Sequence, residues 1–176
     1  PSKVAMEKLL QGNSATKVRK ILNSEYFVTL KKAALATDVA KAERAIIGKP
    51  DKKDCSIYVS IPFCPTRCAY CSFVSYTSKK LLSLIPEYLV RLCRDLDATF
   101  AIAKRQGLNI KTIYIGGGTP TTLSEKQLYI LLSHISSLVD TSSLLEFTLE
   151  AGRPDTMTQE KLQIAKQFGV TRISVN

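Results

Sequence analysis

The sequence predicts an α/β fold with a parallel sheet, preceded by a small helical segment. Across residues 55–176, short apolar runs of the kind found in buried strands alternate with amphipathic helical segments. Strand–helix–strand repetition with right-handed crossovers produces parallel strands. Residues 1–54 show helical periodicity instead. Periodicity alone permits either a barrel or a doubly wound sheet.

The first 50 residues are expected to be helical. Short helices are predicted over 4–10 and 18–22, separated by a Gly-Asn-Ser sequence at 12–14. A third helix is indicated by one apolar stripe with spacings of three and four residues: Leu35, Val39, Ala42 and Ile46. The polar, glycine- and proline-containing segment 48–54 is the expected linker. We therefore predict two domains, 1–54 and 55–176.

Four strands and three helices are expected after the linker. The strands are predicted at residues 56–62, 111–115, 145–149 and 171–175. The first helix covers about 82–106, with Leu89, Leu92, Leu96 and Phe100 on one face and an end at Gly107. The second begins with a capping box at Ser124–Gln127 and carries Leu128, Leu131, Leu132, Ile135 and Leu138 on one face. Thr158 is the expected cap of the third.

Composition indicates an ordinary globular protein. Of 176 residues, 45% are hydrophobic and 23% are charged, and neither a membrane-spanning run nor a signal-peptide pattern is present. Five clustered cysteines argue against a secreted disulfide framework, so we expect a cytoplasmic protein. The net charge of +10 is spread along the chain without an aromatic-interleaved basic stripe, so no nucleic-acid partner is expected. Because the closing residues 172–176 read as a strand that is cut off before its end, we expect the chain to belong to a longer protein.

The most informative motif is Cys64-x3-Cys68-x2-Cys71, directly after the first predicted strand. Three thiolates on one short loop can hold three irons of a four-iron cluster and leave the fourth iron open. A structural zinc site normally closes with four ligands, and ferredoxin-type sites supply four cysteines for each cluster. Cys55 and Cys93 lie too far along the chain to be expected as a fourth ligand. A zinc knuckle or buried structural thiols remain the alternatives.

Two further motifs follow the next two predicted strands. The run Gly116-Gly-Gly-Thr119 can bring backbone close to a ligand, although a tight strand–helix turn requires the same residues. Glu150 ends the third strand, where it is either a binding group or a surface carboxylate. The carboxyl ends of parallel strands are the expected place for a site, and all three motifs fall there.

These motifs resemble the radical S-adenosylmethionine (SAM) enzymes, and in particular the oxygen-independent coproporphyrinogen III oxidase family. The similar stretches are residues 58–73, Ile115-Gly-Gly-Gly-Thr-Pro-Thr-Thr122 and Phe147-Thr-Leu-Glu-Ala-Gly-Arg-Pro154. The resemblance covers about residues 55–176 and looks closest to the coproporphyrinogen dehydrogenase-like branch, which carries an extra N-terminal region. It implies an open (βα)6 radical SAM barrel, of which four strands would form the first two-thirds.

The resemblance also implies two cofactors and their contacts. Cys64, Cys68 and Cys71 would bind a [4Fe-4S] cluster, and SAM would chelate its open iron. Cleavage of SAM by an electron from the cluster would yield a 5′-deoxyadenosyl radical that abstracts hydrogen from substrate. The implied SAM contacts, carried over by motif position, are Tyr58, Tyr70, Gly117, Gly118, Thr119 and Glu150.

Two functions are implied. The first is oxidative decarboxylation of coproporphyrinogen III to protoporphyrinogen IX, with an electron donor such as flavodoxin or ferredoxin. The second is that of the related haem chaperones, which keep the cluster and bind haem without decarboxylation. The best-established decarboxylases have another cysteine two residues after the third ligand, where this chain has Phe73. The departure leaves the choice between the two functions open.

Overall fold

The computed structural model describes residues 2–48, 51–73 and 75–175. It contains two compact units, Pro1–Lys52 and Lys53–Asn176, whose division lies two residues before the boundary expected from the sequence. The linker predicted over 48–54 includes residues 49 and 50, which are outside the described residues.

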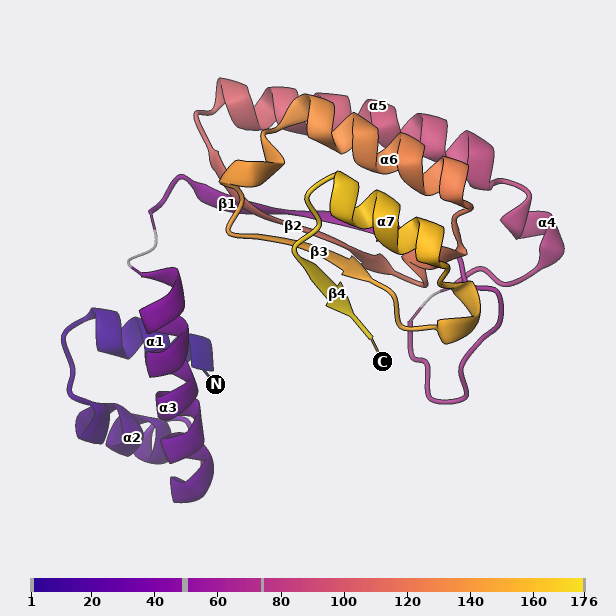
Figure 1. Cartoon of the computed structure of the whole chain (residues 1–176). Coiled ribbons are helices and arrows are strands. Elements are labelled where there is room, and N and C mark those ends of the chain that lie inside the picture. The colour runs from indigo at the N-terminus through magenta and orange to yellow at the C-terminus, as the bar shows by residue number, and fades with distance from the viewer. Residues whose placement is uncertain (1, 49–50, 74, 176) are drawn as a thin grey trace. The chain divides into compact units, whose positions relative to one another are not determined.

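The first unit consists of three helices, α1 (Ser2–Leu10), α2 (Ala15–Ser24) and α3 (Leu30–Ile47), shown in Figure 1. The Ser14 hydroxyl caps α2 by accepting a hydrogen bond from the Lys17 amide at 3.3 Å. Its core combines larger side chains of α1 and α2 (Leu9, Val18 and Leu22) with alanines of α1 and α3 (Ala5, Ala33, Ala36 and Ala40).

The apolar stripe expected on the third helix lies on its exposed side. Leu35 is 65% exposed and Ile46 is 84% exposed, whereas Ala33 and Ala40 are fully buried. Two stripes with helical spacing run along α3, and the stripe that packs against α1 and α2 consists of the small residues Ala33, Ala36 and Ala40. Small side chains let α1 and α2 approach closely, and the leucines of those helices fill the remaining space. Periodicity indicated the helix but did not indicate which side it buries.

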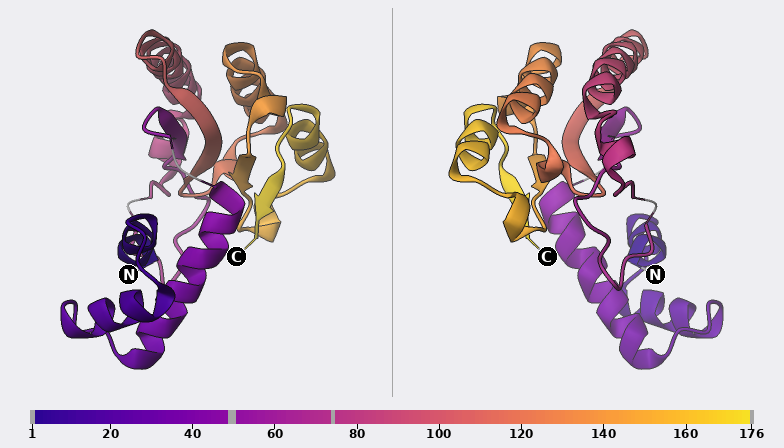
Figure 2. Two further views of the ribbon diagram at one scale, coloured as in Figure 1. Left: turned by 90° about the vertical axis from the view of Figure 1, so that its left-hand side faces the viewer. Right: turned by 90° about the vertical axis from the view of Figure 1, so that its right-hand side faces the viewer.

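The second unit is built on a parallel sheet. Its strands are β1 (Asp54–Ile61), β2 (Asn109–Gly117), β3 (Glu146–Glu150) and β4 (Arg172–Ser174), and they lie in sequence order. The helices α5 (Ile85–Arg105), α6 (Glu125–Leu138) and α7 (Gln159–Gln167) cover one face of the sheet (Figures 1 and 2). Strands in sequence order with helices on one face form a barrel wall, since a doubly wound sheet reverses its strand order. The predicted partial barrel is confirmed.

Short elements complete this unit near the carboxyl ends of the strands and in the connections. They are the helix α4 (Lys79–Leu82) and three 3-10 turns, η1 (Pro120–Thr122), η2 (Thr141–Ser143) and η3 (Pro154–Thr156). None of the four was predicted, because segments of three or four residues are too short to show periodicity.

The core of the second unit lies between the sheet and its helices. The strands contribute Val59, Ile61, Ile113, Ile115, Phe147 and Leu149, and the helices contribute the predicted leucine-rich faces of α5 and α6. Leu92 and Leu138, at the edges of those faces, are only partly buried. Alternation along β1 and β3 turns Tyr58 and Glu150 to the other face of the sheet, away from the helices. Among the described residues, no helix is long and apolar enough to cross a membrane.

Candidate functional site

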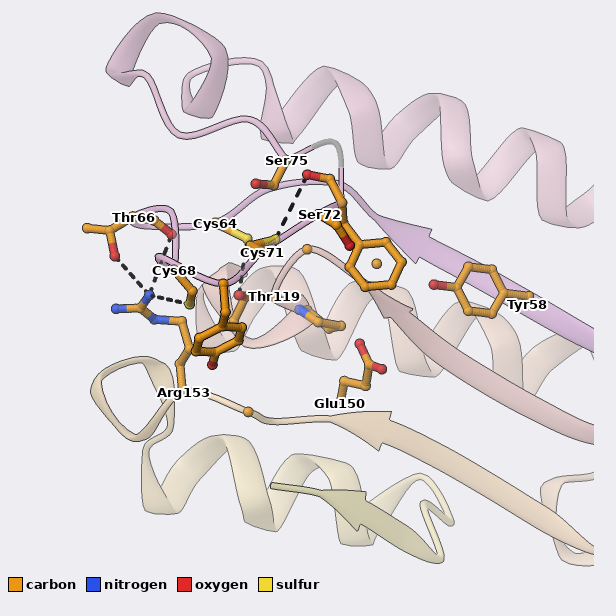
Figure 3. A pocket seen from close by; sticks show the side chains of 16 residues that line it. Tyr58, Cys64, Thr66, Cys68, Cys71, Ser72, Ser75, Thr119, Glu150 and Arg153 are labelled. Atoms are coloured by element: carbon orange, nitrogen blue, oxygen red, sulfur yellow. Dashed lines mark hydrogen bonds between the residues drawn. The ribbon is translucent and has the colours of Figure 1, made fainter. Parts of the chain in front are cut away.

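A pocket of about 210 Å³ lies at the carboxyl ends of β1, β2 and β3. Figure 3 shows side chains from the loop after β1 facing side chains from the ends of β2 and β3. All nine residues nominated from the sequence line this pocket: Tyr58, Cys64, Cys68, Tyr70, Cys71, Gly117, Gly118, Thr119 and Glu150. The structure therefore brings together three motifs that are separated in the sequence.

The cysteine loop begins after β1, and backbone hydrogen bonds join its two ends. The Cys64 amide donates to the Tyr76 carbonyl at 3.1 Å, and the Tyr76 amide donates to the Pro62 carbonyl at 2.8 Å. All three cysteines carry free thiols, with Cys64 buried and the other two half-buried. In the part of the chain that is described, no group of three metal-ligating side chains is already gathered around a common point. Cys55 on β1 and Cys93 on α5 lie outside the pocket.

The glycine loop, Gly116–Thr119, packs closely against the end of β1 and the start of the cysteine loop. A Cβ placed on Gly118 would lie 2.8 Å from the Phe63 carbonyl oxygen and 2.9 Å from the Cys64 sulfur. The Gly118 amide donates to the Ile61 carbonyl at 2.8 Å. These contacts within the chain require glycine at position 118, whether or not a ligand binds there. Contacts of Gly117 and Gly118 with SAM stay a prediction.

We expect Gly118→Ala to destabilise the second unit by about 1–3 kcal/mol, because the added Cβ must displace backbone and the Cys64 side chain. Chemical denaturation measures the stability, and iron content after anaerobic reconstitution reports on Cys64. Gly116→Ala is the comparison, since its Cβ would press on the side chains of Tyr114 and Glu150 instead. A Gly118→Ala variant with unchanged stability and iron content would contradict this packing.

Thr119 is buried beneath the cysteine loop, with 5% of its surface exposed. Its hydroxyl donates to the Cys64 sulfur at 3.3 Å, and its amide donates to the Phe63 carbonyl at 2.8 Å. The side chain therefore supports a thiol, a role that the sequence did not indicate. Its predicted contact with SAM stays a prediction.

Glu150 reaches the pocket beside two tyrosines that extend from β1 and β2. The Tyr114 hydroxyl donates to the Glu150 carboxylate at 2.5 Å, and this hydrogen bond is the main cause that raises the pKa of Tyr114 to about 12. The rings of Tyr58 and Tyr114 stack at a centroid distance of 5.7 Å. Burial, and then the charge of Glu150, raises the pKa of Tyr58. Both hydroxyls therefore remain protonated at neutral pH, and Tyr114 fixes the orientation of the carboxylate.

Tyr70 lies at the mouth of the pocket with 84% of its surface exposed. A hydrogen bond with Cys68 is the largest cause that raises the pKa of its hydroxyl. An exposed ring beside the cysteine loop is available to a ligand, and its predicted packing on adenine stays a prediction.

Arg153, which had no predicted role, directs its guanidinium to the cysteine loop (Figure 3). Its Nη1 donates to the Cys68 sulfur at 3.7 Å and to the Thr66 hydroxyl at 2.8 Å. Arg67, although it stands between the cysteines in the sequence, is exposed and donates to the Cys71 carbonyl at 3.4 Å. The sequence feature that could have indicated this role is the position of Arg153, three residues after the strand end at Glu150.

The buried side chain of Lys161 joins the turn η1, which follows the glycine loop, to the turn η3, which follows Arg153. Lys161 is 7% exposed, and its ammonium donates at 2.8 Å to the carbonyl of Thr121 in η1 and at 2.8 Å to that of Thr156 in η3. The hydroxyls of Thr121 and Thr156 also form a hydrogen bond at 2.6 Å. The ends of β2 and β3 are thereby held in a fixed relation.

We expect Lys161→Met to reduce the free energy of unfolding by about 1.5–3 kcal/mol, because two carbonyls lose charge-assisted hydrogen bonds. Denaturant titration measures the change. Lys166→Met, at an exposed position of the same helix, is expected to change stability by less than about 0.5 kcal/mol. Equal effects of the two substitutions would show that the buried ammonium does not hold the turns.

Comparison with known proteins identifies the family. Residues 58–176 match the radical SAM superfamily. The chain belongs to that superfamily. It is 34% identical, over 100% of its length, to the oxygen-independent coproporphyrinogen-III oxidase-like protein HemZ of Bacillus subtilis, covering 36% of HemZ. It is 45% identical to the haem chaperone HemW of the same organism, over 68% of this chain and 30% of HemW.

A solved structure also resembles this chain. The coproporphyrinogen III oxidase HemN of Escherichia coli, described as a radical SAM enzyme, aligns with a TM-score of 0.59 over 77% of this chain and 30% of HemN, at 22% identity. This likeness shows the fold. The resemblance to the coproporphyrinogen oxidase-like family that the motifs predicted is confirmed. The chain spans about a third of the length of these curated relatives.

Proposed function

We propose that this chain is the cluster- and SAM-binding part of a cytoplasmic radical SAM enzyme of haem biosynthesis, which decarboxylates coproporphyrinogen III to protoporphyrinogen IX without oxygen. The observation that carries the proposal is the alignment with HemZ, an oxidase-like protein, over 100% of the chain. That alignment includes the helical unit, whereas the alignment with HemW covers 68% of the chain.

Cys64, Cys68 and Cys71 would hold a [4Fe-4S] cluster. Their fit to that group rests on the donor set and the surroundings: three free thiols line one pocket, and two of the sulfurs accept hydrogen bonds, from Thr119 and from Arg153. Thiolates are the ligands that iron–sulfur clusters use, and donors to sulfur offset their negative charge. When bound, the cluster supplies the electron for reductive cleavage of SAM.

SAM would lie between the cysteine loop, the glycine loop and the end of β3. Glu150 offers a carboxylate whose orientation is fixed by Tyr114, and such an acceptor suits the hydroxyl or amino groups of SAM. Tyr70 offers an exposed aromatic face, and the backbone of Gly117 and Gly118 lines the same pocket. These residues would hold the cosubstrate in one orientation and leave the chemistry to the bound cofactors.

A haem chaperone is the second candidate. The observations in its favour are the 45% identity to HemW and Phe73 at the position where established decarboxylases carry a further cysteine. Phe73 is 68% exposed and lines the pocket, so an apolar ring stands where the decarboxylases place a thiol. A chaperone would bind haem and release no decarboxylated product.

An anaerobic product assay separates the two candidates. The full-length protein is reconstituted with iron and sulfide and given SAM, a flavodoxin or ferredoxin reducing system and coproporphyrinogen III. Formation of protoporphyrinogen IX together with 5′-deoxyadenosine, detected by mass spectrometry, is the expected result. Release of 5′-deoxyadenosine without decarboxylation, combined with stoichiometric haem binding, would favour the chaperone. Glu150→Gln, which keeps the shape of the side chain and removes its charge, tests the proposed contact with SAM and should lower 5′-deoxyadenosine formation under either candidate.

A further inference from the structure

Arg153 is held in one orientation by its neighbour Asp155. Its Nε donates to one carboxylate oxygen at 3.0 Å, and its Nη2 donates to the other at 2.7 Å. Two parallel hydrogen bonds of this kind fix the plane of a guanidinium. The Arg153 side chain is 21% exposed, so packing restricts it further.

The remaining nitrogen of the guanidinium is directed to the cysteine loop. Nη1 donates to the Thr66 hydroxyl at 2.8 Å and approaches the Thr66 carbonyl at 3.5 Å and the Cys68 sulfur at 3.7 Å. The dashed lines in Figure 3 mark the contacts with Thr66 and Cys68. Because Asp155 occupies Nε and Nη2, the nitrogen that serves the loop is Nη1. One side chain from the end of β3 thus contacts both the middle of the cysteine loop and one of its sulfurs.

The backbone of Arg153 is also fixed. Its carbonyl accepts a hydrogen bond from the Thr156 hydroxyl at 2.9 Å, and Thr156 belongs to the turn that Lys161 ties to the glycine loop. Because the backbone and the guanidinium plane of Arg153 are both fixed, its side chain loses little conformational entropy when it donates to the Cys68 sulfur. This arrangement differs from that of Arg67, which is exposed and donates to a backbone carbonyl rather than to a carboxylate.

We propose that Arg153 is a positioning residue for the cluster: it holds the cysteine loop through Thr66 and donates a hydrogen bond to the Cys68 thiolate, which raises the reduction potential of the cluster. The inference rests on the cluster assignment in the proposed function. Hydrogen bonds to cluster sulfurs and net charge are among the factors that set such potentials. A cationic donor stabilises the more negative, reduced cluster more than the oxidised one. Asp155 serves to orient the donor.

The test is a redox titration of the anaerobically reconstituted full chain, followed by electron paramagnetic resonance. Arg153→Met removes the donor and the charge, and Arg153→Lys keeps the charge but cannot form the same fork. We expect the ratio of reduced to oxidised cluster at a fixed potential to fall about tenfold in Arg153→Met, which is a shift of about 59 mV to more negative values for one electron. Arg153→Lys should lie between it and the unmodified chain. Arg67→Met removes a positive charge from the same loop without removing a donor to sulfur, so it should shift the potential by much less than Arg153→Met.

Each outcome decides the inference. Iron-replete Arg153→Met with the potential of the unmodified chain would overturn it. Loss of iron from folded Arg153→Met and Arg153→Lys, with iron retained in Arg67→Met, would support the inference, because it would show that Arg153 holds the cysteine loop in place for the cluster. Equal shifts in Arg67→Met and Arg153→Met would overturn it, because surface charge alone would then explain the effect. Absence of a cluster from the unmodified chain would instead reject the proposed function on which the inference rests.

Discussion

Replacing Cys68 with alanine is expected to remove the cluster from the chain and leave the fold intact. Cys68 is half-buried in the loop and contributes no side chain to the hydrophobic core, so its loss should cost little stability. Two remaining thiolates cannot hold the three irons that the motif is proposed to bind. Iron and acid-labile sulfide content after anaerobic reconstitution measures the effect, and circular dichroism checks the fold.

Cys55→Ala is the matched control for this substitution. Cys55 is also a half-buried free cysteine, but it lies near the start of β1, at the end of the sheet away from the pocket. We expect this variant to retain its full iron content. A brown, iron-replete Cys68→Ala protein would reject Cys68 as a ligand.

Replacing Phe147 with alanine is expected to produce the largest loss of stability, about 3–5 kcal/mol, because it leaves a cavity in the core. Phe147 is fully buried in the middle of the sheet, where β3 packs under the helices. It belongs to the strand that carries Glu150 and, beyond it, Arg153. Urea denaturation followed by circular dichroism measures the free energy of unfolding of this unit.

Leu145→Ala removes another large apolar side chain, directly before the same strand, and serves as the control. Leu145 is 66% exposed, so the expected change is within about 0.5 kcal/mol. Similar losses in the two variants would contradict the burial of Phe147 in the core.

The sequence was sufficient for the order of the main strands and helices and for placing the three motifs in one pocket. Phe147 and Leu149 lie on the side of β3 that packs under the helices and Glu150 lies on the other side, because a strand turns successive side chains to opposite faces. Motif positions at strand ends were enough to bring Cys64, Gly118 and Glu150 into one pocket, because parallel strands end at one edge of the sheet.

Other features could not be predicted because they depend on partners distant in the sequence. The buried side of α3 is decided by which stripe fits α1 and α2, and periodicity is equal for both stripes. The contacts of Arg153 with Thr66 and of Lys161 with Thr121 join residues 87 and 40 positions apart. Arg67 stands between the cysteines in the sequence, whereas the folded chain presents Arg153 to the Cys68 sulfur.

The most direct test of the cluster- and SAM-binding site is electron paramagnetic resonance of the anaerobically reconstituted, reduced chain before and after SAM is added. The proposed site predicts about four irons and four sulfides for each chain and a spectrum that changes when SAM binds the open iron. A chain that takes up zinc in place of iron, or a cluster whose spectrum does not respond to SAM, would contradict it.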